Sequence, residues 1–190
     1  MFKVRSADER GRGKSSIHQV HYSFSYADYK DPSYESFESM RAINATLIEP
    51  EQELKLDHLL NVECMLLVLD GSIVFKLNQD QALKMRPFDW TFYSYTEGMD
   101  IRIINPTKKK IRIYQIMFDP FKPGGPNNKI QLFHLEHKLA HKEIYLFASD
   151  EGRKGSLKVN INASFYFTSF KKNDFFSYNS SESRPMVTSA

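Results

Sequence analysis

Short runs of β-branched and aromatic residues, separated by turn residues, constrain this chain more than any other feature. The segment Glu63–Leu77 reads ECMLLVLDGSIVFKL, two apolar runs joined at Asp-Gly, which is the dipeptide most typical of a β-hairpin. Similar runs follow as MRPFDWTFYSY, MDIRIINP and KKIRIYQIMF. We therefore predict an all-β chain built as an antiparallel sandwich or barrel.

The composition favours a folded globular protein and argues against a nucleic-acid partner and a membrane span. Hydrophobic residues make up 41% of the 190 residues, enough for a real core, and the net charge of +3 is spread along the chain. The single basic run, Lys108 to Lys110, is expected to be a solvated turn, so no direct nucleic-acid binding is predicted. No run reaches the roughly 18 to 20 apolar residues that cross a bilayer. The lone Cys64 suits a reducing compartment, and a cytoplasmic location is predicted.

A proline- and glycine-rich stretch divides the chain at about two thirds of its length. This stretch reads DPFKPGGPNNK, a composition typical of an irregular connection. We predict an N-terminal domain of residues 1–120, a linker of residues 121–132 and a shorter C-terminal domain of residues 133–190.

Three histidines after the linker raise a metal hypothesis. His134, His137 and His141 would share one face of a helix, and three imidazoles on one face can bind zinc. Lys138 and Lys142 interleave them, however, and no carboxylate completes a known signature. A solvated polar face is the favoured interpretation.

The sequence resembles the pirin family of the cupin superfamily. An Arg-Gly loop precedes HYSFSYADYKDP at residues 21–32, MRAIN follows at 40–44, and ASDEGRKGSL occupies 148–157. Asp89 in Pro-Phe-Asp, Asn105 in Asn-Pro and Gln115 also fall at the family's distances. The resemblance extends from Arg5 to about Arg184 and implies a bicupin of two stacked jelly-roll β-barrels, here with a truncated second cupin domain.

The resemblance also implies where a metal would bind. Pirin-like proteins usually hold one metal in the N-terminal barrel through three histidines and one glutamate. Glu63 and Gly71 reproduce the second half of the first metal motif. Counting from these residues and from Gly98, the positions that match the ligands are Asp57, Leu59, Ile101 and Ile103. Leucine and isoleucine supply no lone pair, so we expect neither a metal nor another cofactor.

Two further side chains near these positions remain metal candidates. They are His58 and Glu63. Alternate residues of a strand face opposite sides, so His58 is expected to point away from Asp57 and Glu63. A surface histidine is the favoured interpretation.

Three functions remain open. The first is a non-enzymatic pirin-like protein that binds a small ligand or a protein partner, in a regulatory or binding role. The alternative is a quercetin 2,3-dioxygenase-like oxidoreductase, which would require iron or another divalent metal. The third is a degenerate or truncated gene product. A truncated second barrel leaves an open sheet edge, which would allow a homo-oligomer.

Overall fold

The computed structural model describes residues 5–56, 61–78, 81–122, 130–135, 144–169, 171 and 174. These residues form fourteen strands in three sheets and two short 3-10 turns, η1 (Ala7–Glu9) and η2 (Arg153–Gly155). The predicted all-β fold is confirmed. Within the described part of the chain, no helix is long and apolar enough to cross a bilayer.

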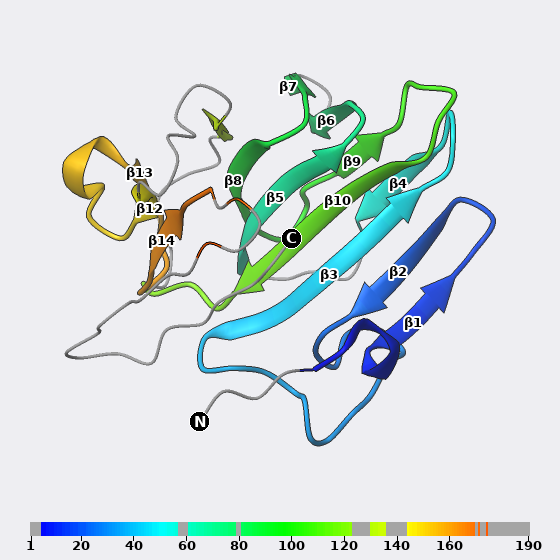
Figure 1. Ribbon diagram of the computed structural model, residues 1–190, viewed down its shortest axis with the longest axis horizontal. Coiled ribbons are helices and arrows are strands. Elements are labelled where there is room, and N and C mark those ends of the chain that lie inside the picture. Colours follow the sequence, from blue (N-terminus) through cyan, green and yellow to red (C-terminus); the bar gives the residue numbers. More distant parts are fainter. Residues whose placement is uncertain are drawn as a thin grey trace.

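The largest sheet is antiparallel and has seven strands (Figure 1). In spatial order they are β1 (Gly11–Lys14), β2 (His18–Tyr22), β3 (Met40–Ile48), β10 (Ile111–Phe118), β5 (Val62–Asp70), β8 (Asp89–Tyr95) and β11 (Gln131–His134).

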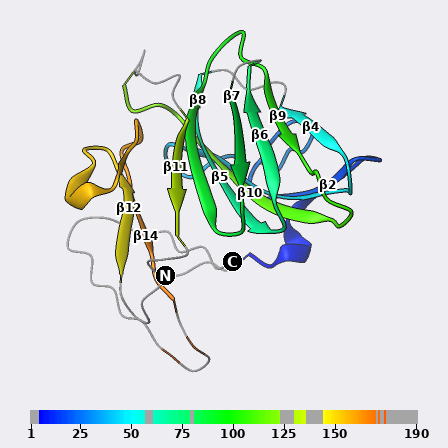
Figure 2. The ribbon, with the colours of Figure 1, turned by 90° about the horizontal axis from the view of Figure 1, so that it is seen from above.

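Two smaller sheets accompany it. The four-stranded sheet runs β4 (Glu53–Leu56), β9 (Ile101–Ile104), β6 (Ile73–Leu77) and β7 (Gln81–Met85). The three-stranded sheet runs β13 (Leu157–Lys158), β12 (Tyr145–Ser149) and β14 (Ser164–Phe167). The four-stranded sheet faces the large sheet and closes a barrel with it, while the three-stranded sheet lies beside β8 and β11 (Figure 2).

Each face of the large sheet buries its own core because alternate residues of a strand point to opposite sides. On β5, Cys64 and Leu66 face the barrel interior, where they pack with Phe75 and other residues of the four-stranded sheet. Met65 and Leu67 face the other way. β5 is therefore buried on both sides, which explains its continuous apolar run.

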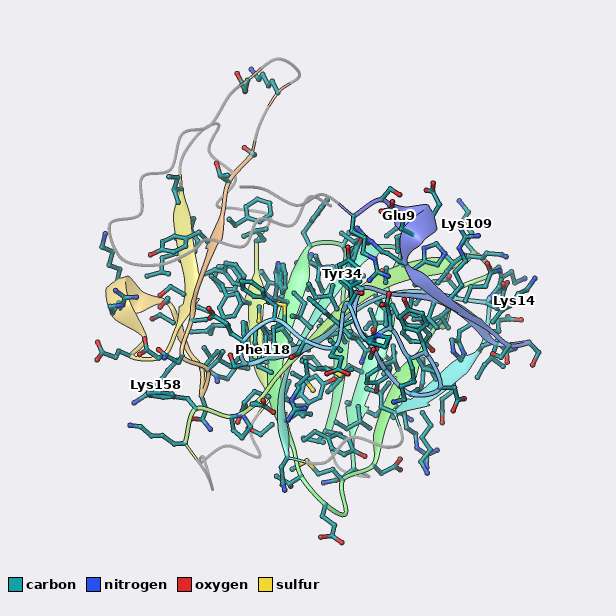
Figure 3. All side chains as sticks on the ribbon, turned by 90° about the horizontal axis from the view of Figure 1, so that it is seen from below. Glu9, Lys14, Tyr34, Lys109, Phe118 and Lys158 are labelled. Carbon is teal, nitrogen blue, oxygen red and sulfur yellow. The ribbon has the colours of Figure 1, made fainter. Side chains whose placement is uncertain are left out.

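An aromatic core joins the outer face of the large sheet to the three-stranded sheet. The rings of Trp90 and Phe147 lie 5.0 Å apart, and those of Phe118 and Phe165 lie 5.5 Å apart, edge to face. Figure 3 shows Phe118 between the barrel and the three-stranded sheet. The C-terminal segment is thus packed against the barrel by apolar burial.

The hairpin predicted at Asp70-Gly71 is wrong in its pairing. β5 pairs with β10 and β8, whereas β6 pairs with β7 and β9, so the turn carries the chain from one sheet to the other. Gly71 has φ of +79°, and a Cβ there would lie 2.3 Å from Ile111 Cγ2. The Asp-Gly signal identified the tight turn, but the partners of both strands lie elsewhere in the chain.

The strand β11 spans the predicted boundary between the linker and the C-terminal domain. It pairs antiparallel with β8, with Phe133 opposite Trp90. The predicted boundary between linker and C-terminal domain falls inside this strand, and residues on both sides of it extend the N-terminal sheet. The division into domains stays a prediction.

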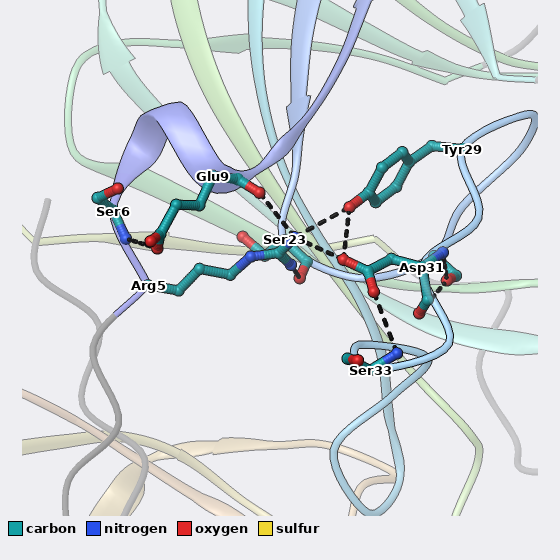
Figure 4. A network of polar contacts seen from close by, with 8 residues as sticks. Arg5, Ser6, Glu9, Ser23, Tyr29, Asp31 and Ser33 are labelled. Carbon is teal, nitrogen blue, oxygen red and sulfur yellow. Dashed lines mark hydrogen bonds and ion pairs between the residues drawn. The ribbon is translucent and has the colours of Figure 1, made fainter.

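Arg5, Tyr29, Asp31 and Tyr34 form a group of contacts that we call the N-terminal latch (Figure 4). Arg5 donates to the Ser23 carbonyl oxygen at 2.6 Å and to Asp31 Oδ2 at 2.9 Å, and its guanidinium lies 3.7 Å from the ring centroid of Tyr34. The Tyr29 hydroxyl also donates to Asp31 Oδ2, at 2.9 Å. These hydrogen bonds, that of Tyr29 foremost, lower the pKa of Asp31. The motif holds the β2–β3 connection against the barrel.

Candidate functional site

Two of the four positions that match the family's metal ligands lie in the barrel core. Ile101 and Ile103 on β9 are both 0% exposed and point into the interior with Phe75. In the register of the four-stranded sheet, Ile103 stands opposite Leu54 on one side and Phe75 on the other. These side chains supply apolar volume and no electron pair, so they do not fit a metal ion. Asp57, His58 and Leu59 lie outside the described residues.

Glu63 points away from the barrel interior. It shares a face of β5 with Met65 and Leu67, toward the three-stranded sheet. Ser94 Oγ donates to its Oε2 at 2.8 Å, and Asn160 Nδ2 donates to its Oε1 at 3.1 Å. Glu63 therefore ties the C-terminal segment to β5 and β8 and lies on the opposite side of the sheet from Ile101 and Ile103.

The described histidines do not gather into a metal site. His134 Nδ1 contacts Asp89 Oδ1 at 2.5 Å, and Asp89 Oδ2 also accepts the backbone N–H of Arg86 at 2.7 Å. Within the ranges that the structure describes, no three His, Cys, Asp or Glu side chains lie close enough to hold an ion. His137 and His141 lie outside these ranges.

The barrel interior carries a group of neutral polar side chains, which we call the polar row: Asn44 on β3, Gln115 on β10 and Tyr93 on β8. Their exposed fractions are 2%, 4% and 3%. Asn44 Oδ1 is buried without a hydrogen-bond partner in the described structure, whereas the Tyr93 hydroxyl lies close enough to interact with the Gln115 amide and the Cys64 thiol. Asn44 and Gln115 stand directly opposite each other across neighbouring strands.

A sequence signal for the polar row exists, although sequence reasoning did not assign it a function. Asn44 and Thr46 stand between Ala42 and Ile48 on the inward face of β3. Gln115 stands between Ile113 and Met117 on the inward face of β10. Buried polar residues on faces that also carry core residues are the unusual feature, because buried polar groups need partners.

The environment of the polar row is uncharged. Burial raises the pKa of the Cys64 thiol to about 12, so the thiol is protonated and is no nucleophile near neutral pH. Burial also raises the pKa of Tyr93, with Cys64 adding to the effect and a hydrogen bond from the Gln115 amide opposing it. Tyr26, which packs against the same core, has its pKa raised by burial as well. The site can form hydrogen bonds but offers no charge.

The fold and this interior define a class of protein. A seven-stranded and a four-stranded antiparallel sheet enclose an apolar core in a jelly-roll barrel, which is the cupin architecture. The crystal structure of YhhW from Escherichia coli has the same fold, with a TM-score of 0.74 and 24% identity over 85% of this chain and 68% of that one. YhhW has also been solved as a bacterial pirin in complex with nickel(II). YhaK from Escherichia coli superposes with a TM-score of 0.60 over 75% of this chain and 61% of that one, at 23% identity.

Sequence comparison finds similar proteins of the same fold class. The quercetin 2,3-dioxygenase of Escherichia coli K12 is 26% identical over 168 residues, 87% of this chain and 71% of that protein. PM1685 of Pasteurella multocida, whose name also refers to quercetin 2,3-dioxygenase, is 28% identical over 127 residues, and the chain spans 54% of its length. No family model matches. The predicted resemblance is confirmed: in sequence the chain is similar to quercetin 2,3-dioxygenases and to a pirin-like protein of Escherichia coli, and its fold is that of the pirin-like cupins.

Proposed function

We propose that this pirin-like cupin works without the family's usual metal, as a non-enzymatic protein that binds a small ligand in a binding or regulatory role. The observation that carries the proposal is the burial of Ile101 and Ile103 at two of the four positions that match metal ligands. A divalent ion beside them would lose its hydration water and gain no ligand in exchange, which is strongly unfavourable.

The polar row supports ligand binding in place of metal binding. Among its neutral side chains, the buried Asn44 Oδ1 has no hydrogen-bond partner in the described structure, and the Tyr93 hydroxyl interacts only with Gln115 and Cys64. A bound molecule that pairs with those atoms would recover the stability that their burial costs. The row is a weak candidate for a metal, since an amide nitrogen is no ligand and the Tyr93 hydroxyl stays protonated, which leaves the single amide oxygen of Asn44.

The alternative function is a metal-dependent, quercetin 2,3-dioxygenase-like oxidoreductase. The names of the relatives from Escherichia coli and Pasteurella multocida favour it. It would require iron or another divalent metal, with ligands from residues outside the described ranges, such as Asp57 and His58.

Metal analysis combined with turnover separates the two functions. The purified protein would be analysed by inductively coupled plasma mass spectrometry and assayed with quercetin after addition of iron, copper or nickel, with the Escherichia coli quercetin 2,3-dioxygenase as positive control. We expect metal far below one ion per chain and no turnover. One ion per chain together with turnover would overturn the proposal.

Glu63→Ala supplies a matched control for metal content. Glu63 faces the three-stranded sheet, so its removal is expected to leave the metal content near zero while weakening the contact to Asn160. A fall in metal content on this substitution would show that a metal site is active and would contradict the proposal.

We also propose that the chain self-associates through its C-terminal sheet. Among the described residues β14 pairs with β12 along one side, and its Tyr166 side chain is 47% exposed. An open strand edge flanked by an exposed ring favours pairing with a second copy. Gel filtration is expected to give a mass above the 22.2 kDa of one chain, and elution as a monomer would contradict it.

A further inference from the structure

We infer that the outer edge of β1 is a docking site for an extended, acidic segment of another protein, which adds a strand to the large sheet. β1 is the last strand on its side of that sheet, and among the described residues it pairs only with β2. Figure 1 shows β1 at the margin of the large sheet. The inference goes beyond the small-ligand function because it concerns a surface outside the barrel interior.

The hydrogen bonds of the β1–β2 hairpin decide which backbone groups of β1 face outward. The Ser15 N–H donates to the His18 carbonyl oxygen at 2.9 Å, so these two residues form a hydrogen-bonded pair. Such pairs recur at every second residue of an antiparallel ladder, which assigns the bonds with β2 to Gly13 and Gly11. The backbone groups of the other two residues of β1 therefore point away from β2.

Arg12 and Lys14 are these two residues, and both side chains are exposed. Within the described part of the chain, no other strand pairs with this edge. A strand that adds there satisfies the outward N–H and C=O groups, and its residues directly opposite Arg12 and Lys14 lie beside two positive charges. Aspartate or glutamate suits those two positions of the partner.

The charges of Arg12 and Lys14 are not neutralised by acidic residues of the described structure. Neither side chain has an ion-pair partner among the described residues. Asp8 and Glu9 precede the strand in η1, and the Glu9 carboxylate accepts the Ser6 N–H at 2.9 Å. Figure 3 shows Glu9 at η1 and Lys14 apart from it. An acidic partner therefore finds two cations available at this edge.

The other face of β1 favours apolar side chains in the partner. A Cβ atom at Gly11 would lie 2.5 Å from the Tyr29 ring, and one at Gly13 would lie 2.8 Å from the Tyr22 hydroxyl. The two rings are stacked with their centroids 5.9 Å apart, so aromatic surface takes the place of side chains on β1. An apolar side chain of an added strand packs beside such rings. The preferred segment therefore alternates acidic and apolar residues.

A second copy of this chain does not fit the edge. If two copies of β1 paired antiparallel about a two-fold axis, the basic side chains of one copy would face those of the other. Like charges directly opposite each other destabilise a strand pair, and basic residues on an edge strand prevent self-pairing in this way. The occupant is therefore a different chain with negative charge.

The test is a titration of the full chain with a short peptide in which glutamate and valine alternate, followed by fluorescence anisotropy and backbone amide NMR. We expect saturable binding, with the largest shifts in β1 and β2. The matching peptide of lysine and valine should bind at least about tenfold more weakly. The glutamate peptide with N-methyl groups on its glutamates keeps the charge but loses the N–H groups that face β1, so it should also bind at least about tenfold more weakly.

A pair of double variants separates this edge from the general charge of the protein. Arg12→Gln with Lys14→Gln should weaken binding of the glutamate peptide by about fivefold and remove most of its salt dependence. Lys84→Gln with Lys158→Gln removes two exposed charges from β7 and β13 and should leave binding unchanged.

Several results would overturn the inference without touching the proposed function. Equal binding of the N-methylated and unmethylated glutamate peptides would show plain attraction of an anion. Equal binding of the lysine peptide, shifts outside β1 and β2, or equal effects of the two double variants would also contradict it. The comparison of peptides uses the unsubstituted chain and stays decisive if a variant fails to fold. Metal content and quercetin turnover test the proposed function separately.

Discussion

Two tyrosines on one face of β8 offer a sharp test of the interior described above. The Tyr95 hydroxyl lies 3.2 Å from the carbonyl oxygens of both Leu56 and Met99, which share its one proton, whereas the Tyr93 hydroxyl interacts only with the Gln115 amide and the Cys64 thiol. Both rings are buried in the barrel core. Replacing either tyrosine by phenylalanine keeps the ring and removes only the hydroxyl, so the difference between the variants isolates the hydrogen bonds.

The expected free energies differ in size. Tyr95→Phe leaves buried carbonyl groups without their donor and should lower the free energy of unfolding by about 1–3 kcal/mol. Tyr93→Phe removes a buried hydroxyl whose only partners are a side-chain amide and a thiol, so the loss should be smaller, about 0.5–1 kcal/mol.

Urea unfolding measures both variants in the ligand-free protein. The chain has one tryptophan, Trp90, buried against Phe147 in the outer core, and its fluorescence reports the loss of that packing. Equal m-values across the variants would show that the midpoint shifts reflect stability. A loss for Tyr93→Phe as large as that for Tyr95→Phe would refute the weaker hydrogen bonding assigned to the Tyr93 hydroxyl.

Three further predictions follow from single contacts. Cys64, whose pKa burial raises to about 12, should react with a thiol reagent only at the rate of unfolding, and rapid labelling of the native protein would contradict this. The Asp31 pKa is lowered by Tyr29 and Arg5, so its carboxylate stabilises the N-terminal latch above the ordinary aspartate pKa of about 3.9 and loses this effect as the pH falls through the lower folded value. Asp31→Asn should abolish that acid dependence of hydrogen exchange in β1 and β2, and a dependence like that of the parent chain would argue against the latch. Gly71→Ala should cost at least about 1–2 kcal/mol in thermal or urea unfolding, because φ is positive and the new Cβ would meet Ile111, and a neutral result would contradict the turn geometry.

The sequence supported the fold class through patterns that are local. Alternation along strands such as β10 and the tight turn at Gly71 depend on neighbouring residues, so both could be predicted. The pairing of β5 could not. An Asp-Gly turn is compatible with a hairpin, but β5 pairs with β10 and β8, and those pairings bury both of its faces.

The candidate site shows the same division. The absence of lone-pair donors at Ile101 and Ile103 is a property of the residues themselves and was predicted from sequence. The surroundings of Glu63 were not predicted. Strand alternation says which residues of β5 share its face, but only the tertiary structure shows that this face is covered by the C-terminal segment and not by the barrel interior. Asn160, far along the chain, supplies the partner.

The sequence by itself determined that the chain is all-β, that it resembles the pirin-like cupins, and that the positions matching that family's metal ligands are largely apolar, because side-chain chemistry and strand alternation are properties of individual residues and their neighbours. Only the tertiary structure decided that Asn44, Gln115 and Tyr93 share one buried interior. Those residues come from strands separated by long stretches of chain, and their convergence follows from the strand order of the large sheet.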